Sequence, residues 1–338
     1  FMEYSIIADG RMWNTILSIL KEKAAAGVDV RLLYDDVGCL RLLPQGYYAT
    51  MEEYGIKCEA FNPFVPFVSV VMNNRDHRKI LVIDGDVGFT GGINLADEYI
   101  NEKERFGYWK DTGIMLKGDA VWNLTVMFLH IWNALRPTDT SFDCFRPHTY
   151  RKQEYGSDGF VQPYGDSPLD FENVGENVYL NIINTAKEYV YIFTPYLIID
   201  NEIATALTLA AKRGVDVRIV TPHIPDKKTA FMLTQSYYEQ LMGGGVKIYE
   251  FTPGFIHAKC FVCDDRVATV GTVNLDYRSL YLHFECGVFL YRTSSVMDVK
   301  QDALETIARS IPVTQDMLKP VLQKVLIQAI LKLFAPLF

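Results

Sequence analysis

The chain carries the same sequence blocks twice, in the same order. One kind of block runs from the end of a helix through a glycine into an apolar strand. The other kind is an apolar strand that begins with charged residues and is followed by a segment that turns back. The matching pairs are AAAGVDVRLLYDD (24–36) with AAKRGVDVRIVTP (210–222), YGIKCEAFNPF (54–64) with GGVKIYEFTPGF (244–255), and HRKILVIDGDVGFTGGINLAD (77–97) with HAKCFVCDDRVATVGTVNLDY (257–277). A repeat of this length predicts two structurally equivalent halves.

Strands alternate with helices in each half. FMEYSII precedes a helical stretch from about residue 11 to 26, and YVYIFTPY precedes another from about 201 to 213. This alternation predicts an α/β fold of two pseudo-twofold-related halves, each with a mostly parallel or mixed β-sheet flanked by helices. We expect a first half at 1–140, a connector rich in Pro, Gly, Asp and Ser at 141–170, a second half at 171–310 and an amphipathic helical segment at 311–338.

The composition opposes several classes of protein. With 338 residues, of which 49% are hydrophobic, the chain can bury a large core. Its net charge of −8 and pI of about 5.3 argue against a basic surface that binds polyphosphate, so no nucleic-acid partner is expected. The six cysteines are too sparse for a disulfide scaffold. Cys260 and Cys263 would face opposite sides of a strand, which opposes a zinc site.

The strongest functional signal is a polar motif, HxKxxxxD followed by GxxN, inside the third repeated block. Its members are His77, Lys79, Asp84, Gly91 and Asn94 in the first copy, and His257, Lys259, Asp264, Gly271 and Asn274 in the second. The His and Lys of each copy lie two apart on a strand and therefore share a face. The segment after each strand predicts a hairpin that brings the Asn back beside them. A pseudo-twofold axis would place both sets around one cleft, where they suit a tetrahedral phosphate.

These groups predict phosphate transfer through a covalent intermediate. One histidine can attack phosphorus, while the other protonates the leaving oxygen and later deprotonates the incoming hydroxyl. Lys and Asn donors would stabilise the charge on the non-bridging oxygens. This chemistry needs neither a metal nor a cofactor, and we expect none. Asp84 and Asp264 fall at the far end of each strand on the opposite face, which favours a turn-forming role over catalysis.

The doubled motif resembles the hallmark of the phospholipase D superfamily, and almost the whole chain is similar to bacterial cardiolipin synthases. The segments that carry this closer resemblance are GVDVRLLYDDVG (27–38), HRKILVIDG and GFTGGINLADEYI (within 77–100), YWKDT (108–112), TPYLIID (194–200), GVDVRIVTP (214–222), HAK through GTVNLDYRSLYLHFE (257–285) and the closing KLFAPLF. The resemblance implies transfer of a phosphatidyl group from one phosphatidylglycerol to another, giving cardiolipin and glycerol.

The resemblance also implies a role for each motif residue. His77 corresponds to the nucleophile and His257 to the acid/base. The other members of the candidate catalytic set are Lys79, Asp84, Lys259 and Asp264, with Lys79, Lys259, Asn94 and Asn274 holding the phosphate.

Two carboxylates are candidates for orienting the histidines. Glu285 resembles the family carboxylate that binds a catalytic His through its other ring nitrogen, and Asp111 is the candidate for the matching role in the first half. The family pattern after WKDT usually continues with His, where this chain has Gly113. The remaining histidines, His283 among them, lack repeated spacing, which predicts structural or surface roles.

The same motifs leave other functions open. If water enters instead of a glycerol hydroxyl, the protein is a phosphodiesterase that hydrolyses phospholipid or nucleic acid. A catalytically silent membrane-binding scaffold is a third alternative, and two intact His-Lys-Asn sets oppose it.

Phosphatidylglycerol and other phospholipids are the expected partners, together with a membrane surface; no oligomeric state is assigned. The family usually carries two transmembrane helices ahead of its catalytic region, whereas this chain has no run of 18 apolar residues. The resemblance therefore implies a catalytic portion that works at the surface of the bacterial inner membrane. The C-terminal segment MLKPVLQKVLIQAILKLFAPLF either lies in the bilayer interface or packs on the sheet as a last core helix.

Overall fold

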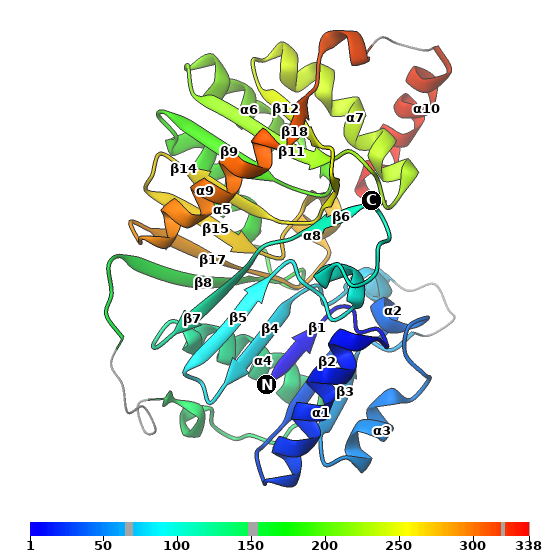
Figure 1. The fold of residues 1–338 in the computed structure, drawn as a ribbon, viewed down its shortest axis with the longest axis vertical. Helices are drawn as coiled ribbons and strands as arrows, with labels where there is room; N and C mark the ends of the chain where they lie inside the picture. Colours follow the sequence, from blue (N-terminus) through cyan, green and yellow to red (C-terminus); the bar gives the residue numbers. More distant parts are fainter. Residues whose placement is uncertain (65–69, 148–154, 319–321, 338) are drawn as a thin grey trace.

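Two β-sheets, one from each half, form the frame of the molecule (Figure 1). The computed structural model describes residues 1–64, 70–147, 155–318 and 322–337. Part of the expected connector (148–154) and part of the expected C-terminal segment (319–321 and 338) lie outside the described residues.

The first half forms a six-stranded sheet. Its order is β3 (Lys57–Phe61), β2 (Arg31–Asp35), β1 (Met2–Tyr4), β4 (Lys79–Ile83), β5 (Val87–Gly91) and β7 (Gly113–Lys117). Strands β1, β2 and β3 run parallel, as βαβ connections require, whereas β4 pairs antiparallel with β1 and β5, and β5 with β7.

The second half repeats this order in an eight-stranded sheet. The strands are β18 (Ser310–Pro312), β12 (Lys247–Phe251), β11 (Asp216–Pro222), β9 (Tyr189–Phe193), β14 (Cys260–Cys263), β15 (Val267–Gly271), β17 (Glu285–Tyr291) and β8 (Phe160–Asp166). Leaving out the edge strands β18 and β8, the order matches that of the first sheet strand for strand. The predicted fold class is confirmed, in its mixed-sheet form. The edge strand β8 lies inside the segment expected as a connector, and the proposed boundaries between the parts stay a prediction.

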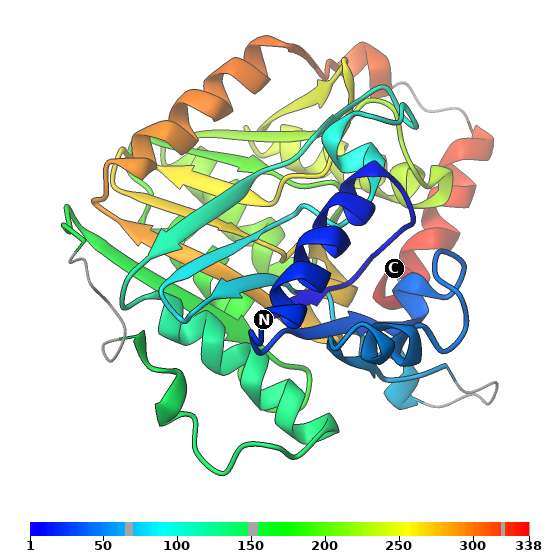
Figure 2. The ribbon, with the colours of Figure 1, turned by 60° about the horizontal axis from the view of Figure 1, so that its bottom comes forward.

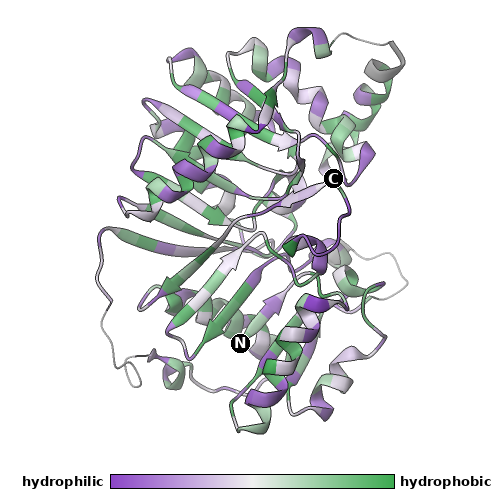
Figure 3. Cartoon of the chain, viewed as in Figure 1, coloured by the Kyte–Doolittle hydropathy of each residue, from purple (hydrophilic) through white to green (hydrophobic). Residues whose placement is uncertain are grey.

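Helices cover both faces of each sheet (Figures 1 and 2). In the first half, α1 and α3 pack on one face and α4 on the other, while α5, α6 and α7 cover one face of the second sheet and α9 the other. The helices are α1 (Arg11–Ala25), α2 (Asp36–Cys39), α3 (Tyr47–Glu53), α4 (Val121–Leu135), α5 (Val174–Thr185), α6 (Asn201–Lys212), α7 (Lys228–Gly243), α8 (Tyr277–Tyr281), α9 (Ser295–Ala308) and α10 (Leu322–Leu333). Hydrophobic residues lie along the strands of both sheets (Figure 3). One cluster includes Val82 of β4 and Val288 of β17, so the two halves share part of their core.

The repeated glycines end equivalent helices. Gly27 follows α1 with φ +85° and Gly214 follows α6 with φ +94°, a backbone conformation that side chains with a Cβ disfavour. The next residue closes each turn, since Val28 N donates to Lys23 O and Val215 N to Ala210 O. The prediction that these glycines end helices is therefore confirmed. After Gly27 the chain continues into β2, and after Gly214 it continues into β11.

Two short two-stranded sheets complete the description. Strand β10 (Leu197–Ile198) pairs with β16 (Leu275–Asp276), and β6 (Tyr108–Lys110) of the first half pairs with β13 (Gly254–Ile256) of the second. The second pair ties the halves together. In the described part of the chain, every helix is too short or too polar to cross a bilayer.

Candidate active site

Both motif histidines lie at the junction of the halves, and backbone hydrogen bonds hold them there. His77 enters β4, and its backbone N–H donates to Phe284 O of the second half at 2.9 Å. His257 follows β13, and its N–H donates to Lys110 O of the first half at 2.7 Å. Each half therefore fixes the backbone of the other half's histidine, as a pseudo-twofold axis requires.

Each histidine is bound by a carboxylate from the opposite half. His77 Nδ1 lies 2.8 and 3.0 Å from the two Glu285 oxygens, and His257 Nδ1 lies 2.8 Å from Asp111 Oδ2. An ionised carboxylate only accepts hydrogen bonds, so Nδ1 carries the proton in both rings. The neutral rings therefore keep a lone pair on Nε2, the atom that can attack phosphorus or take a proton. Both predicted carboxylates are in contact with motif histidines, and the exchange between halves is a feature that the motif spacing did not indicate.

The two carboxylates are buried, yet their surroundings keep them ionised. Glu285 has no exposed side-chain surface, and Asp111 has 3%. The histidine contacts hold the pKa of both carboxyls below the usual range despite burial. Thr272 Oγ1 also donates to Glu285 Oε2, and Thr112 N donates to Asp111 Oδ1 at 2.9 Å. Each carboxylate is thus a fixed acceptor that orients one imidazole.

Burial keeps both imidazoles neutral in the unliganded protein. Burial and the charges of the neighbouring lysines together lower the pKa of His77 to about 3 and that of His257 to about 4, although the carboxylates act in the opposite direction. Their side chains are 17% and 10% exposed. The neutral form is the one a nucleophile needs.

Both motif lysines are almost completely buried beside their histidines. Lys79 Nζ donates to His77 O, and Lys259 Nζ donates to His257 O and lies 2.9 Å from His257 Nδ1. Burial lowers the pKa of Lys79 to about 8 and that of Lys259 to about 7, and the charge of Lys79 also acts on Lys259. Two ammonium groups that influence each other across the junction form a positive region suited to an anion.

The motif asparagines differ in their contacts. Asn94 Oδ1 accepts from Ile6 N at 3.1 Å, and its Nδ2 donates to Tyr99 OH at 2.9 Å. The Tyr99 ring in turn meets the His257 ring edge-on, with centroids 5.4 Å apart. Asn274 is 5% exposed, and among the described residues its buried Oδ1 has no hydrogen-bond partner. Asn94 therefore positions Tyr99, which contacts His257 of the opposite half. Phosphate binding by either amide stays a prediction.

The motif aspartates form turns. Asp84 with Gly85, and Asp264 with Asp265, all have positive φ, and the turns close through Asp86 N to Ile83 O and Arg266 N to Cys263 O. Two adjacent left-handed residues define the type I′ hairpin turn, in which Asp is favoured. Asp264 also accepts from the backbone N–H groups of residues 187–189. These contacts agree with the turn-forming role favoured from the sequence.

His283 is a site residue that the sequence interpretation missed. Its ring centroid lies 5.6 Å from that of His77, and its Nδ1 lies 3.7 Å from Glu285 Oε1. Arg278 Nε donates to its Nε2 at 3.4 Å, which places the proton of the neutral ring on Nδ1, toward Glu285. The absence of a repeated partner concealed this residue. Its position two residues before Glu285 was the available signal, because such residues share a face of extended chain.

Among the described residues, His77, His283 and Glu285 are the one group whose ligand atoms could meet a metal ion, all within 4.8 Å of one another. The hydrogen bond and close contact between them already satisfy that carboxylate, and the phosphate chemistry expected here runs on imidazole alone. Cys260 and Cys263 are buried in separate core clusters on opposite faces of β14, as the strand geometry predicts.

Gly113, which departs from the family pattern, leaves the Asp111 contact intact. It opens β7 opposite Gly91 of β5, and a Cβ there would meet only ordinary van der Waals neighbours. The orienting contacts of Asp111 come instead from Thr112 N and from Trp109 Nε1 at 3.5 Å.

Comparison with known proteins decides the family. The profile described as "Cardiolipin synthase, PLD-like domain" matches residues 6–119 and 179–307, one stretch from each half. The chain belongs to the phospholipase D superfamily. Within it the chain is of the cardiolipin synthase type, and the prediction of an enzyme of the phosphatidyltransferase class is confirmed.

Several bacterial relatives are similar along most of the chain. An uncharacterized protein of Streptococcus mutans is 54% identical over 339 residues, covering 100% of this chain and 73% of that protein. A cardiolipin synthase of Halalkalibacterium halodurans is 39% identical (89% and 59% covered), and cardiolipin synthase 2 of Bacillus cereus is 36% identical (99% and 65% covered). The chain thus spans less than two thirds of the length of both cardiolipin synthases.

A solved structure supports the fold independently. Phosphatidylserine synthase of Haemophilus influenzae superposes with a TM-score of 0.72 at 17% identity, covering 99% of this chain and 87% of that one. At this identity the likeness concerns the arrangement of the two halves.

Proposed function

We propose that the chain catalyses cardiolipin synthesis from two molecules of phosphatidylglycerol, with glycerol as the second product. The observation that carries the proposal is the pair of neutral histidines, each bound through Nδ1 to a buried carboxylate of the opposite half. Relatives named cardiolipin synthase support the choice of substrate.

The first step forms a phosphatidyl-enzyme. His77 Nε2 attacks phosphorus, the bond from phosphorus to the headgroup glycerol oxygen breaks, and His257 protonates that oxygen. The entering phosphodiester carries a negative charge, which favours protonation of His257 and offsets the effect of burial on its pKa. Lys79 and Lys259 stabilise the charge on the non-bridging oxygens.

The second step transfers the phosphatidyl group. Neutral His257 removes the proton from a glycerol hydroxyl of a second phosphatidylglycerol, whose oxygen attacks phosphorus and breaks the bond to His77. His257 again carries a proton, and His77 regains its lone pair. Glu285 and Asp111 hold each ring with Nε2 directed to the reaction and stay ionised throughout.

A lipid assay tests the reaction and its alternatives. Purified chain is mixed with phosphatidylglycerol vesicles in EDTA, and cardiolipin, phosphatidic acid and free glycerol are followed together. Cardiolipin with an equal amount of glycerol is expected. Phosphatidic acid as the only lipid product would show that the chain hydrolyses phosphatidylglycerol instead of transferring the phosphatidyl group. Vesicle binding without any turnover would support a membrane scaffold.

We propose that α10 contacts the membrane surface, which for this family type is the bacterial inner membrane. One side of α10 packs on α7, where Gln328 donates to Met232 O at 3.0 Å. The other side exposes a row of apolar side chains: Leu326, Ile327, Ile330, Leu333 and Phe334. An exposed apolar helix face suits a bilayer interface.

Sedimentation with phosphatidylglycerol vesicles tests this contact. Leu333→Glu, which places a charge on a side chain that is 79% exposed, is expected to weaken vesicle binding at least tenfold. Leu209→Glu on α6, at a side chain 49% exposed, is the matched control and should bind as the unaltered chain does. Equal binding by all three proteins would remove α10 from the membrane contact.

A further inference from the structure

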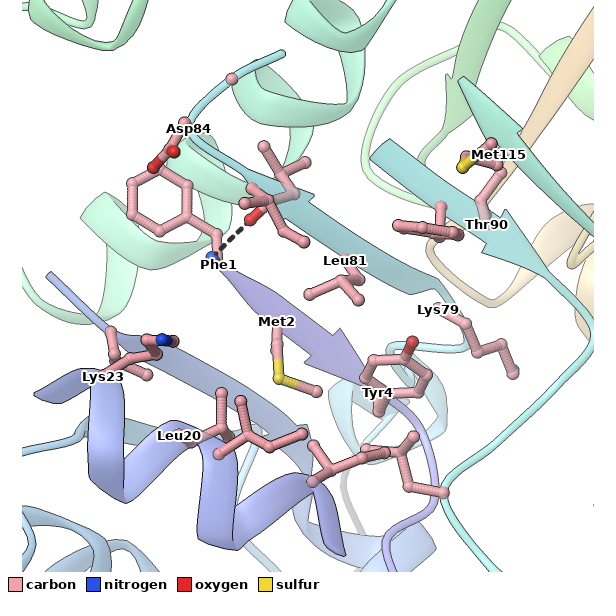
Figure 4. A pocket seen from close by; sticks show the side chains of 18 of the residues that line it. Phe1, Met2, Tyr4, Leu20, Lys23, Lys79, Leu81, Asp84, Thr90 and Met115 are labelled. Carbon is pink, nitrogen blue, oxygen red and sulfur yellow. Dashed lines mark hydrogen bonds between the residues drawn. The ribbon is translucent and has the colours of Figure 1, made fainter. Parts of the chain in front are cut away.

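Apolar surface near the catalytic residues takes a different form in each half. In the first half it lines a hollow of about 1330 Å³ between α1 and strands β1, β4, β5 and β7, with Lys79 among the lining residues (Figure 4). In the second half it projects outward, because Leu169 and Phe171 stand on the loop of residues 167–173 that joins β8 to α5. A hollow receives an apolar group, whereas projecting side chains enter an apolar environment.

The exposure of these two side chains is extreme. Phe171 is 108% exposed, the highest value of any large apolar residue in the described part of the chain, and Leu169 is 72% exposed. Single exposed apolar residues are common on protein surfaces. Two at the tip of one loop form a small apolar surface in contact with solvent, which suits an interaction site.

Hydrogen bonds at its base hold the loop in place. Asp166, the last residue of β8, accepts from Ser167 N at 3.0 Å and from Val174 N and Gly175 N of α5 at 3.2 and 2.8 Å. One buried carboxylate thus joins both ends of the loop. The outward position of the tip follows from this closed base.

The acidic residues of the loop make contacts within it. Asp170 Oδ1 accepts from Glu172 N at 3.0 Å, and Glu172 Oε1 accepts from Asn177 Nδ2 of α5 at 2.7 Å. The loop sequence, SPLDFEN, contains no basic residue that an anionic surface could attract. Any affinity of this loop for a membrane must therefore come from its two apolar side chains.

The loop stands beside the carboxylate of the His77 half-site. Asp166 is the register partner of Glu285 on the neighbouring strand β17, and Glu285 contacts His77. At the base of the loop, Gly175 lies against Val273, which precedes the second motif asparagine; a Cβ on Gly175 would lie 3.1 Å from Val273 Cγ1. The loop therefore leaves the second sheet at the end that carries the catalytic groups.

Helix α8 connects the loop base with the end of α10. Tyr281 of α8 donates to Asp200, and Glu176 in the first turn of α5 lies beside both side chains. The 3-10 turn η6 (Ala335–Leu337), which follows the exposed Leu333 of α10, packs on α8 from the other side of the sequence. A continuous row of contacts thus links the loop to the helix proposed above as a membrane contact.

We propose that the loop of residues 167–173 is an interfacial anchor, whose Leu169 and Phe171 side chains enter the bilayer surface and hold the entrance of the active site at the lipid headgroups. The inference rests on the proposed function, because a phospholipid substrate presents its phosphodiester at that level of the bilayer. A loop next to Glu285 is well placed to bring the catalytic groups there.

A protein surface, including that of a second copy of this chain, is the competing occupant. A stable protein interface buries about 800 Å² on each partner, far more than two side chains supply. A bilayer accepts a few projecting apolar side chains, and their contribution adds to that of α10. The small size of the apolar tip therefore favours the bilayer.

Tryptophan fluorescence tests insertion without any assay of activity. Phe171→Trp places a reporter at the loop tip, and Phe160→Trp is the matched control, because Phe160 is 73% exposed at the opposite end of β8. Each variant is mixed with vesicles of phosphatidylglycerol whose acyl chains carry bromine, which quenches tryptophan on contact. The signal of the four natural tryptophans is measured in the unaltered chain and subtracted.

We expect the added fluorescence of Phe171→Trp to be lost on the brominated vesicles and that of Phe160→Trp to be retained. Equal quenching of the two reporters, or none at residue 171, would overturn the proposal. A doubled mass in vesicle-free solution that Leu169→Ser with Phe171→Ser abolishes would overturn it in favour of a second copy of the chain.

Turnover separates anchoring from catalysis. The double variant Leu169→Ser with Phe171→Ser should lower kcat/KM for phosphatidylglycerol in vesicles by about tenfold or more, because two buried apolar contacts are lost. Turnover of short-chain phosphatidylglycerol dissolved as monomers should stay unchanged. An equal loss on both substrates would place the loop in the catalytic machinery and overturn the anchor. If the unaltered chain forms no cardiolipin from either substrate, the proposed function fails, and the fluorescence result alone decides the role of the loop.

Discussion

The two half-sites share one scaffold but differ in what surrounds the histidine. His77 faces both oxygens of Glu285 and has a second histidine, His283, nearby. His257 faces one oxygen of Asp111, and its ring is enclosed by Tyr99, Trp109 and Phe255. The symmetric backbone contacts position both rings alike, whereas the side chains that vary between the halves set their chemistry.

This difference favours separate roles. The His77 side chain is the more exposed of the two, at 17% against 10%, and its Nδ1 lies within 3.0 Å of both oxygens of its carboxylate, whereas that of His257 contacts one. Lys259 Nζ lies 2.9 Å from the ring of His257, so the proton affinity of His257 depends on a neighbouring charge and on the bound phosphate. An oriented, accessible imidazole suits a nucleophile, and one whose protonation responds to the substrate suits an acid/base.

Replacing the histidines should give the largest effects. We expect His77→Ala to abolish turnover, by about 10⁴-fold or more, and His257→Ala to reduce kcat by about 10³-fold. Cardiolipin formation from phosphatidylglycerol measures both. Similar losses from both variants would leave the assignment open to the adduct experiment below, and full activity of His77→Ala would refute it.

The exchanged carboxylates come next. Glu285→Gln and Asp111→Asn keep the shape but lose the charge that fixes the Nδ1 proton, and we expect kcat to fall by about 10³-fold and 10²-fold, respectively. The second loss is smaller because Asp111 contacts its histidine through one oxygen, whereas Glu285 contacts its histidine through two. Unchanged KM in both would show that the carboxylates orient the rings rather than bind substrate. A larger loss in Asp111→Asn would reverse the comparison.

The lysines should give a pH dependence that also separates the halves. Burial lowers the pKa of Lys259 to about 7 and of Lys79 to about 8, so the positive charge is present at lower pH and lost as pH rises. We expect kcat/KM for phosphatidylglycerol to fall about tenfold or more between pH 6 and 9, since this ratio reports the free enzyme. Lys259→Arg keeps its charge and should remove the earlier part of the decline. A flat profile in the unaltered chain would contradict the account.

The smallest effect should come from His283. His283→Asn keeps a polar group beside Glu285 but removes the ring that lies next to His77, and we expect kcat to fall by about three- to tenfold. The matched control is His130→Asn on α4, which lies outside the contacts of the site and should leave kcat unchanged. A loss as large as that of Glu285→Gln would make His283 part of the central machinery.

Most of the fold followed from the sequence because the repeat is local and periodic. Gly27 and Gly214 end equivalent helices, and the Asp84 and Asp264 turns follow from hairpin chemistry that acts over a few residues. The sheet order and its antiparallel part required the observation that both halves use the same connections.

The crossing of the carboxylates could not be predicted from spacing. Asp111 and Glu285 hold equivalent places ahead of or at the start of β7 and β17, yet each contacts the histidine of the opposite half. That pairing depends on how the two sheets pack, which is a tertiary property. His283 was missed for a related reason, since the equivalent position in the first half is Trp109 rather than a histidine, and its partner Arg278 lies on the separate helix α8.

The most direct test of the account is to identify the residue that carries the phosphatidyl group. The chain is incubated briefly with phosphatidylglycerol in EDTA, quenched, digested under conditions that preserve phosphohistidine and mapped by mass spectrometry. The account predicts an adduct on the peptide that contains His77, and its accumulation in His257→Ala. An adduct on the His257 peptide, or turnover to cardiolipin with no adduct at either histidine, would contradict it.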